Sequence, residues 1–303
     1  MQKNNKLFTY ISKKINKYDY YHGDEIISTD DGDYFVKKMN GNEKYLYDYL
    51  LSRNFKNFLD ITNNYDDQYK LYQYRTDNVS IEDKAIDLVN LLSLLHIKTT
   101  TYREIDLDNV KKIYETVNEE LDYLDTYYHN MQDFIETRIY MSPAEYLLIR
   151  NISSIYYMLS ISKTNINKWY EIKSYKKKER VVLAHNNLSL NNFIDSGIPV
   201  FKNWENAKKD FAVYDFYKFY RNNYNDLEFS SLFEIYQSKY KFTDDELILF
   251  KALVFKIWKV EFTKSNYDNC VIVSNLITYM NKTFEFFLEE DKEDEKTNDD
   301  KLN

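Results

Sequence analysis

The feature that most constrains the fold is a non-helical insertion within a long helical region. Apolar residues recur at helical spacing in IEDKAIDLVNLLSLLHIK (81–98) and in NVKKIYETVNEELDYLDTYY (109–128). The stretch RVVLAHNNLSLNNFIDSGIPVFKNW (180–204) interrupts this pattern. VVLA has the composition of a short buried strand, and NFIDSGIPVFKNW that of a hairpin whose turn lies near Ser196 and Gly197. The sequence therefore predicts a helical unit that carries a loop and a small hairpin.

The N-terminal quarter of the chain has a mixed pattern. YDYYHGDEIIS (18–28) and DYFVKKM (33–39) have the composition of strands, and the turn-rich TDDGD joins them. NEKYLYDYLLSRNF (42–55) has apolar residues at helical spacing, and QYKLYQYRT (68–76) has the composition of another strand. The predicted order in this region is strand, strand, helix, strand.

Together these patterns predict an α+β protein with two lobes. We expect a small lobe of sheet and helix at residues 1–77 and a larger, mainly helical lobe at residues 78–287. The remaining stretch, LEEDKEDEKTNDDKLN (288–303), holds eight acidic residues and three lysines, so −5 of the net charge of −8 lies there. Its low hydrophobicity and high charge predict a disordered acidic tail attached to a nearly neutral body.

Composition excludes several classes of function. An acidic chain lacks the basic footprint of nucleic-acid-binding proteins. The single cysteine, Cys270, excludes an internal disulfide, and no CxxC or paired-histidine spacing indicates a metal site. The first residues lack the apolar segment of a signal peptide, and no run of about 18 apolar residues could span a membrane. We therefore expect a cytoplasmic protein with no membrane span.

Four stretches carry a resemblance to a known family. They are LVNLLSLLH, ending at His96; HNNLSLNN, beginning at His185; NWE, beginning at Asn203; and VYDFYKFYR, containing Asp215. In order and spacing they resemble the protein-kinase-like fold of the aminoglycoside phosphotransferase and choline kinase branch, which includes bacterial spore-coat-type (CotS-like) relatives. The resemblance covers residues 20–285 and implies a two-lobed kinase-like fold.

The family's catalytic segment, H-G-D-x-x-x-x-N, matches His185, Asn186, Asn187 and Asn192. The resemblance implies a structural role for His185 and a supporting role at a second metal for Asn192. Asn187 occupies the position of the aspartate that accepts the proton of the substrate hydroxyl. An amide has no such basicity, and a positioned base contributes about 10²–10⁴ in rate. Asn187 therefore predicts the loss of the catalytic base.

The hairpin ends on a second degenerate motif. The family's D-W-E matches Asn203, Trp204 and Glu205. The resemblance implies that position 203 binds the Mg²⁺ ion that bridges the nucleotide phosphates. A neutral amide oxygen is a weaker ligand for this hard cation than a carboxylate. Glu205 is a possible substitute ligand, which could reach the metal only after a shift of the backbone.

A kinase-like site also needs a cation on a strand to hold nucleotide phosphates. YFVKK offers Lys37 or Lys38, and strand alternation places Phe35 and Lys37 on one face. We prefer Lys37, because it completes an apolar run like that of the family, and we expect Glu43 to be its ion-pair partner. The alternative is that both are ordinary surface charges.

These observations predict a degenerate phosphotransferase that acts by binding a partner protein or a small ligand, with a spore-coat-type structural role by analogy. ATP and Mg²⁺ are weakened candidates, and no cofactor is certain. Two alternatives stay open. One is an active ATP-dependent phosphotransferase with an alcohol acceptor, using Glu205 and Asn192 around one metal. The other is a sensor that binds a nucleotide without Mg²⁺.

Overall fold

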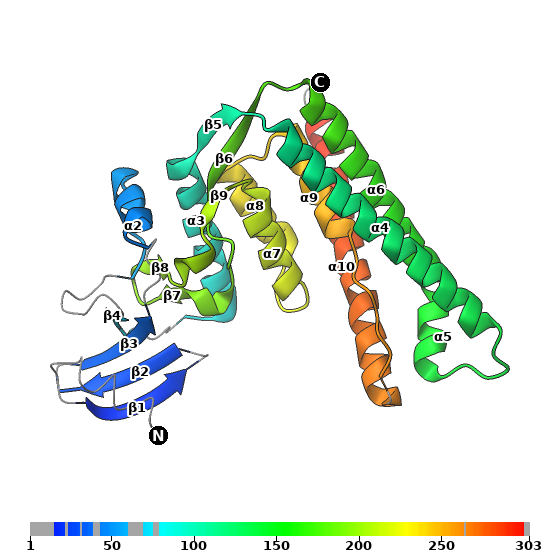
Figure 1. The fold of residues 1–303 in the computed structure, drawn as a ribbon, viewed down its shortest axis with the longest axis horizontal. Coiled ribbons are helices and arrows are strands. Elements are labelled where there is room, and N and C mark those ends of the chain that lie inside the picture. The colour runs from blue at the N-terminus through cyan, green and yellow to red at the C-terminus, as the bar shows by residue number, and fades with distance from the viewer. Residues whose placement is uncertain are drawn as a thin grey trace. The chain divides into compact units, whose positions relative to one another are not determined.

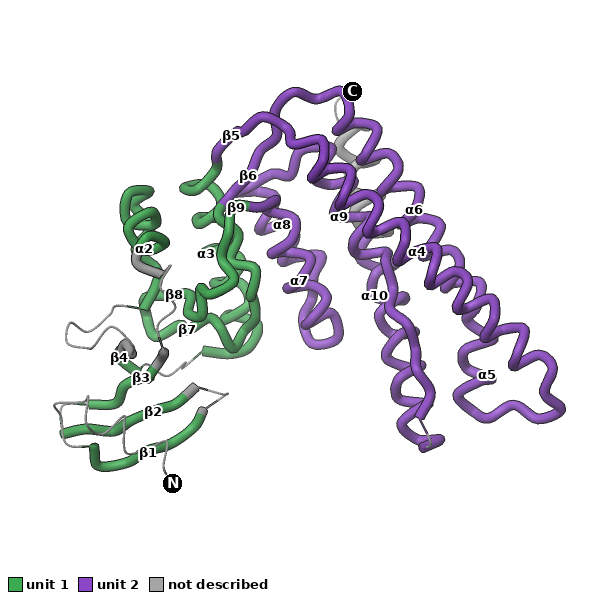
Figure 2. Tube along the Cα trace, in the orientation of Figure 1, with its two compact units in different colours: residues 1–100, 183–209 green, residues 101–182, 210–303 purple. Residues whose placement is uncertain are grey.

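The computed structural model describes seven stretches of the chain: 15–21, 24–30, 32–38, 43–59, 69–74, 79–263 and 265–299. By internal contacts the chain divides into two compact units, shown in Figure 2. Unit 1 comprises residues 1–100 and 183–209, and unit 2 comprises residues 101–182 and 210–303. The sequence places a lobe boundary after residue 77, whereas this division groups the first long helix and the loop–hairpin segment with the N-terminal strands.

The described part of unit 1 combines an antiparallel sheet, two α-helices and the loop–hairpin segment (Figure 1). Its elements are β1 (Ile15–Tyr21), β2 (Asp24–Thr29), β3 (Gly32–Lys38), α2 (Glu43–Ser52), β4 (Tyr69–Gln73), α3 (Ile81–Thr99), η1 (Leu190–Asn192), β7 (Phe193–Asp195), β8 (Pro199–Phe201) and η2 (Trp204–Asn206). The sheet has the order β1-β2-β3-β4, with each neighbouring pair antiparallel, and β7 pairs with β8.

The structure corrects one predicted strand. The sequence predicts a single strand over residues 18–28, but β1 and β2 are separate antiparallel strands in which Tyr18 pairs with Ile27. The sequence His-Gly-Asp at 22–24 is a turn signal that the prediction passed over, because glycine and aspartate favour turns. The aromatic and β-branched residues on either side of this turn have strand propensity, so the two segments together were predicted as one strand.

One apolar cluster fixes the hairpin to the sheet of unit 1. The strand register pairs Phe35 of β3 with Ile26 on one side and with Tyr72 on the other. Ile194 of β7 and Val200 of β8 pack against this row, and all five side chains are buried. Fully burying a large apolar side chain stabilises a fold by about 1.5–3 kcal/mol. The hairpin is therefore held against this face of the sheet by burial of apolar surface.

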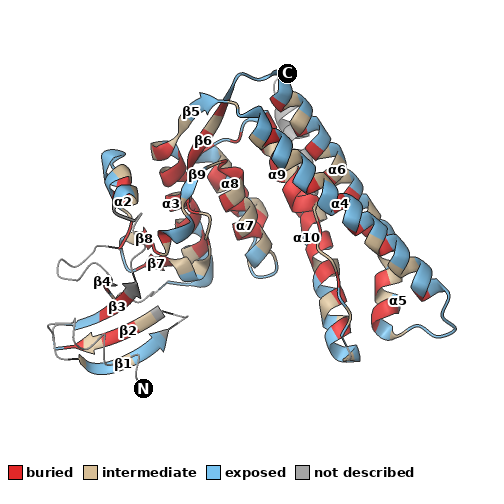
Figure 3. Ribbon diagram, in the orientation of Figure 1, coloured by how far each residue is buried: buried red, intermediate tan, exposed pale blue. Residues whose placement is uncertain are grey.

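The described part of unit 2 is mainly helical. Its elements are β5 (Thr101–Glu104), α4 (Leu107–Glu136), α5 (Pro143–Arg150), α6 (Ile152–Tyr175), α7 (Val213–Asn223), α8 (Phe229–Lys239), α9 (Asp244–Phe255) and α10 (Asn266–Asp299). β5 pairs antiparallel with β6 (Lys178–Ala184), and both β6 and β9 (Lys208–Asp210) cross the division between the units. α6 packs against α4 and α9, and Figure 3 shows that α9 is buried along much of its length.

Two helices differ from the sequence-based expectation. The apolar pattern over residues 141–160 predicts one helix, but the structure breaks it at Asn151 between α5 and α6. α10 continues to Asp299, so its backbone is helical over most of the predicted disordered tail. Glutamate and lysine are good helix formers, and opposite charges three or four residues apart support a helix. The side chains beyond Phe287 lie outside the described residues.

A buried ion-pair network ties together four elements of unit 2. The Lys173 ammonium on α6 lies 3.4 Å from the Glu179 carboxylate on β6 and 3.0 Å from the Asp245 carboxylate on α9. All three side chains are buried. Arg103 on β5 lies 2.7 Å from Glu179, and Lys176 lies 2.6 Å from Asp245. The two carboxylates are therefore matched by cations, as buried charges require.

The protein is expected to lose stability as the pH falls from about 4 to about 2. Burial raises the pKa of Asp245, but the hydrogen bond from Lys176 and the charge of Lys173 outweigh burial and lower this pKa from 3.8 to about 2. A carboxyl group with a lowered folded-state pKa stabilises the fold above its unfolded pKa, and that stabilisation is lost on acidification through the folded pKa. The shift corresponds to about 2 kcal/mol.

Urea unfolding of the wild type and of Asp245→Asn between pH 2 and pH 6 measures this contribution. The wild type should show the steeper loss of unfolding free energy below pH 4, since the variant lacks the titrating group. Parallel pH profiles for the two proteins would contradict the assignment.

Candidate functional site

The end of β6, which leads into the loop before β7, is anchored to α3 within unit 1. The backbone N–H of Leu183 donates a hydrogen bond to the hydroxyl of Thr99, at the C-terminal end of α3 (3.1 Å). Asn186 then adopts a left-handed conformation with φ of 59°. The backbone N–H of Asn192 donates to the carbonyl of Ser189 (3.0 Å), which closes the turn of η1. This path returns the chain to the hairpin and brings the predicted site residues together.

His185 is fully buried beneath this loop. Its Nε2 atom donates to the carbonyl of Lys202 (2.9 Å), and its ring packs against Trp204 (4.7 Å between ring centroids) and Phe201 (5.3 Å). Because a carbonyl oxygen only accepts, Nε2 carries a proton in this arrangement and is not available as a base. The ring therefore connects the start of the loop to the end of the hairpin.

Three of the predicted site residues form a hydrogen-bonded series, here called the amide chain (Asn187, Asn192 and Asn203). The Asn192 Nδ2 donates to the backbone carbonyl of Asn187 (2.7 Å), and the Asn203 Nδ2 donates to the Asn192 Oδ1 (2.6 Å). All three residues are half-buried. Asn203 has φ of 66° and ψ of 57°, a left-handed conformation that asparagine tolerates better than most residues. The positions matched to the base and to both metal ligands therefore converge.

The amide chain is poorly suited to bind a divalent cation. Asn203 directs its Nδ2, rather than its oxygen, at Asn192, and the amide oxygens carry no formal charge. Glu205, the possible substitute ligand, is exposed in η2. Within the described stretches, no group of three or more His, Cys, Asp or Glu residues could hold a metal ion.

Lys202 is a buried residue next to Asn203 that the sequence-based prediction did not name. Its side chain is only 7% exposed, and its ammonium lies 5.2 Å from the centre of the Phe35 ring on β3. Its backbone N–H donates to the carbonyl of Asn192 (2.9 Å), so Lys202 lies directly beside the amide chain. The available signal was strand alternation, which places Lys202 on the face of Val200, a member of the buried cluster.

For Lys37, the lysine predicted to bind nucleotide phosphates, the structure describes the backbone only. The side chains of Lys37 and Glu43 lie outside the described residues, so their ion pair stays a prediction. The backbone of β3 is described, and strand alternation places Phe35 on the same face as Lys37. Phe35 is buried there against Ile194 and Val200. Apolar side chains therefore cover the face of the sheet on which Phe35 lies.

A carboxyl pair lies at the other end of the hairpin. Burial raises the pKa of Asp87 on α3, and the hydrogen bond and charge of Asp195 on β7 raise it further. Asp195 also accepts a hydrogen bond from the backbone N–H of Gly197 (3.1 Å), whose φ of 95° suits glycine. These contacts link α3 to the hairpin turn.

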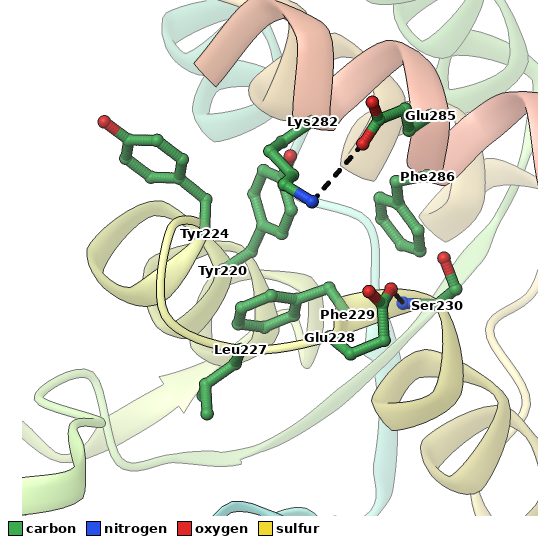
Figure 4. A pocket seen from close by; sticks show the side chains of 9 residues that line it. All are labelled: Tyr220, Tyr224, Leu227, Glu228, Phe229, Ser230, Lys282, Glu285 and Phe286. Carbon is green, nitrogen blue, oxygen red and sulfur yellow. Dashed lines mark hydrogen bonds and ion pairs between the residues drawn. The ribbon is translucent and has the colours of Figure 1, made fainter. Parts of the chain in front are cut away.

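Unit 2 contains a pocket that the sequence did not indicate (Figure 4). The rings of Tyr220, Phe229 and Phe286 line it, and the ion pair of Lys282 with Glu285 (3.4 Å) lies at its rim. Its volume is about 80 Å³, whereas pockets for drug-sized ligands occupy about 300–1,000 Å³. A water molecule takes up about 30 Å³ of liquid, so the pocket has room for a few waters but not for a nucleotide.

Two other residues of the family-like motifs are buried. His96 lies within α3 of unit 1, and Asp215 lies in the first turn of α7 in unit 2. None of the described helices is long and apolar enough to cross a membrane.

No protein-family model and no curated protein matches the chain. The chain is, however, similar in fold to solved structures. An aminoglycoside phosphotransferase from Alicyclobacillus acidocaldarius superposes with a TM-score of 0.69 at 11% identity, over 94% of this chain and 95% of that one. The fold is that of the aminoglycoside phosphotransferases. A spectinomycin phosphotransferase bound to AMP superposes with a TM-score of 0.55 at 11% identity, over 95% of this chain and 93% of that one.

The aminoglycoside phosphotransferase fold confirms the predicted α+β class, with an antiparallel N-terminal sheet and a larger, mostly helical part. At 11% identity the likeness concerns the fold and does not carry over the roles of individual residues. The chemistry of this chain must therefore be argued from its own side chains.

Proposed function

We propose that the protein is a degenerate phosphotransferase that acts by binding rather than by phosphoryl transfer. The observation that carries this proposal is the amide chain, in which the side-chain amide of Asn203 donates to the Asn192 Oδ1 and positions 187 and 203 carry no carboxylate. Phosphoryl transfer depends on a positioned base or nucleophile-orienting group and on metal ions that neutralise the developing charge. The amides at positions 187 and 203 supply neither a base nor an anionic metal ligand.

The same geometry weakens the alternative of an active enzyme. Glu205 is exposed in η2 and follows Asn203, whose Nδ2 is bonded to Asn192, so a metal site built on Glu205 and Asn192 requires rearrangement of both. A sensor of intact nucleotides is weakened by the burial of Phe35 in the apolar cluster beside the predicted phosphate-binding cation. A protein partner in a spore-coat-type assembly is supported by analogy alone.

Thermal unfolding with ATP, with and without Mg²⁺, tests the proposed function. We expect no Mg²⁺-dependent rise in Tm and no ATP turnover, because the carboxylates that would hold the metal are replaced by amides. A Mg²⁺-dependent rise together with turnover that is lost in Glu205→Gln would establish the active-enzyme alternative. Glu119→Gln, at an exposed glutamate on α4 of unit 2, is the matched control for that variant.

A further inference from the structure

We infer that the two ends of the α4–α6 helix pair bind each other between copies of the chain, so that the protein associates head to tail. α4 and α6 pack against each other within unit 2 (Figure 1). Tyr114 stacks on Tyr170 near one end of the pair (4.2 Å between ring centroids), and His129 stacks on Tyr156 towards the other (4.3 Å). The helices are therefore antiparallel, and the 30 residues of α4 separate the two ends by about 45 Å.

One end of the pair carries exposed apolar side chains, here called the tip surface (Phe134, Ile139 and Tyr140). Phe134 lies in the last turn of α4, and Ile139 and Tyr140 lie in the loop before α5, which Figure 3 shows as exposed. Ile139 is 90% exposed and Tyr140 is 88% exposed. Isoleucine and phenylalanine are usually buried, and a cluster of exposed apolar residues, unlike a single one, indicates an interaction surface.

The loop that carries the tip surface is held by Glu145, which is buried in the first turn of α5. Its carboxylate accepts hydrogen bonds from the Arg138 guanidinium and from the backbone N–H of Ser142 (2.6 Å), on either side of the exposed loop residues. The Arg138 guanidinium also lies 5.2 Å from the centre of the Phe134 ring. A surface that is already ordered loses little conformational entropy on binding, so this loop is suited to docking.

The other end of the pair carries exposed aromatic and basic side chains, here called the base surface (Tyr102, Tyr175, Lys177 and Lys178). Tyr175 ends α6 and is 83% exposed, and Tyr102 on β5 is also exposed. Lys177 and Lys178 lead into β6, and both are exposed. The backbone N–H of Ile105, just before α4, donates to the carbonyl of Lys177 (3.1 Å), so the base surface lies at the end opposite to the tip surface.

The two ends are complementary in charge. Residues 119–136 of α4, which lead to the tip surface, contain six acidic residues and no lysine or arginine. The six, all exposed, are Glu119, Glu120, Asp122, Asp125, Asp133 and Glu136. The base surface instead carries lysines beside its tyrosines. Contact of unlike ends brings opposite charges together, whereas tip-to-tip or base-to-base contact juxtaposes like charges, which costs free energy.

The tip surface therefore fits a second copy of the chain better than a lipid surface. Anionic membranes attract basic segments, and the residues that lead to the tip surface are acidic. Contact between unlike ends leaves a free tip and a free base in each pair of copies, so association continues into open chains. Few side chains take part, so each contact is small and weak. Both surfaces lie outside the amide chain, so self-association does not depend on whether the protein transfers phosphate.

Sedimentation velocity of the full chain, from micromolar to submillimolar concentration, tests this self-association. We expect the weight-average sedimentation coefficient to rise with concentration, and to rise less in high salt, because salt screens the charges. Two double variants remove one surface each: the tip variant Ile139→Ser/Tyr140→Ser and the base variant Lys177→Glu/Lys178→Glu. Each should raise the dissociation constant at least about tenfold, as loss of interface anchors does.

Each variant has a control with the same substitutions at exposed residues elsewhere on the chain. Ile81→Ser/Tyr45→Ser is the control for the tip variant, and Lys56→Glu/Lys168→Glu is the control for the base variant. Both controls should associate like the wild type.

A mixture of the tip variant and the base variant gives the sharpest result, because each keeps the surface that the other lacks. At concentrations where the wild type associates, each variant alone should sediment as a monomer, whereas an equimolar mixture should form dimers and nothing larger. Since a dimer requires both variants to be folded, this result also excludes misfolding as the cause of the loss.

The inference is overturned if the wild type sediments as a monomer at every concentration, if the variants associate like their controls, or if the mixture stays monomeric. Binding of the wild type to phosphatidylserine vesicles that is lost in the tip variant, without self-association, would also overturn it and assign the tip surface to membranes. ATP turnover bears on the proposed function alone, so the two can fail separately.

Discussion

Lys173→Met is expected to lower the free energy of unfolding by about 3–5 kcal/mol, the range for removing one partner of a buried ion pair. The variant leaves Glu179 and Asp245 buried with less compensating charge, because the Lys173 ammonium contacts both carboxylates. It also removes the contact of that ammonium with the Phe211 ring (4.6 Å to its centre). Urea unfolding at pH 7 measures the change.

The matched control is Lys168→Met on the same helix, where the lysine is exposed. Surface substitutions of this kind usually change stability by less than about 0.5 kcal/mol. If the two methionine variants unfold at the same urea concentration, the network does not stabilise unit 2 as described. The pair of variants also separates loss of charge from the general effect of placing methionine on α6.

Asn203→Asp is the prediction with the largest expected effect on the site. The new carboxylate would face the Asn192 Oδ1, which now accepts from the Asn203 Nδ2 at 2.6 Å. We expect the variant to lose stability without metal, by less than the about 1–3 kcal/mol that a fully buried unsatisfied polar group costs, because Asn192 and Asn203 are half-buried. Because Mg²⁺ prefers charged oxygen ligands, millimolar Mg²⁺ should recover part of this loss in the variant and not in the wild type.

Thermal unfolding with and without Mg²⁺ measures this effect, and the double variant Asn187→Asp/Asn203→Asp should enlarge it. Asn191→Asp is the control, because Asn191 is an exposed asparagine in the same loop. A Mg²⁺ response of equal size in the control would show general ion screening. Absence of any response in the double variant would mean that the amides are not what keeps the metal out.

The sequence predicted those parts of the fold that depend on local pattern. The 3.6-residue apolar period located α3 and the core of α4, and the strand–loop–hairpin order located β6 to β8. The break at Asn151 and the separation of β1 from β2 were missed, because continuous apolar or aromatic runs mask a local interruption. The helical backbone of α10 beyond residue 288 was missed because net charge was weighed above helix propensity.

The site was predictable where neighbours in sequence are neighbours in space. Asn187 and Asn192 lie in one loop, and the short hairpin brings Asn203 back to them. Lys202 was overlooked because lysine is usually a surface residue. Its burial depends on the packing of the hairpin against β3. That packing is a long-range contact, which a single sequence does not encode as a local pattern.

The left-handed backbone at Asn186 and Asn203 also restricts which residues selection could place there. A positive φ is unfavourable for residues that are branched or bulky at the β-carbon. Glycine, asparagine and aspartate are therefore the residues that these two positions tolerate best. Among these residues, substitution of aspartate by asparagine removes a negative charge and keeps the backbone conformation. If metal binding at this loop were lost during evolution, substitution of aspartate by asparagine would be the change that perturbs the backbone least. Saturation mutagenesis at position 203, scored for folding alone, should recover the same small set of residues.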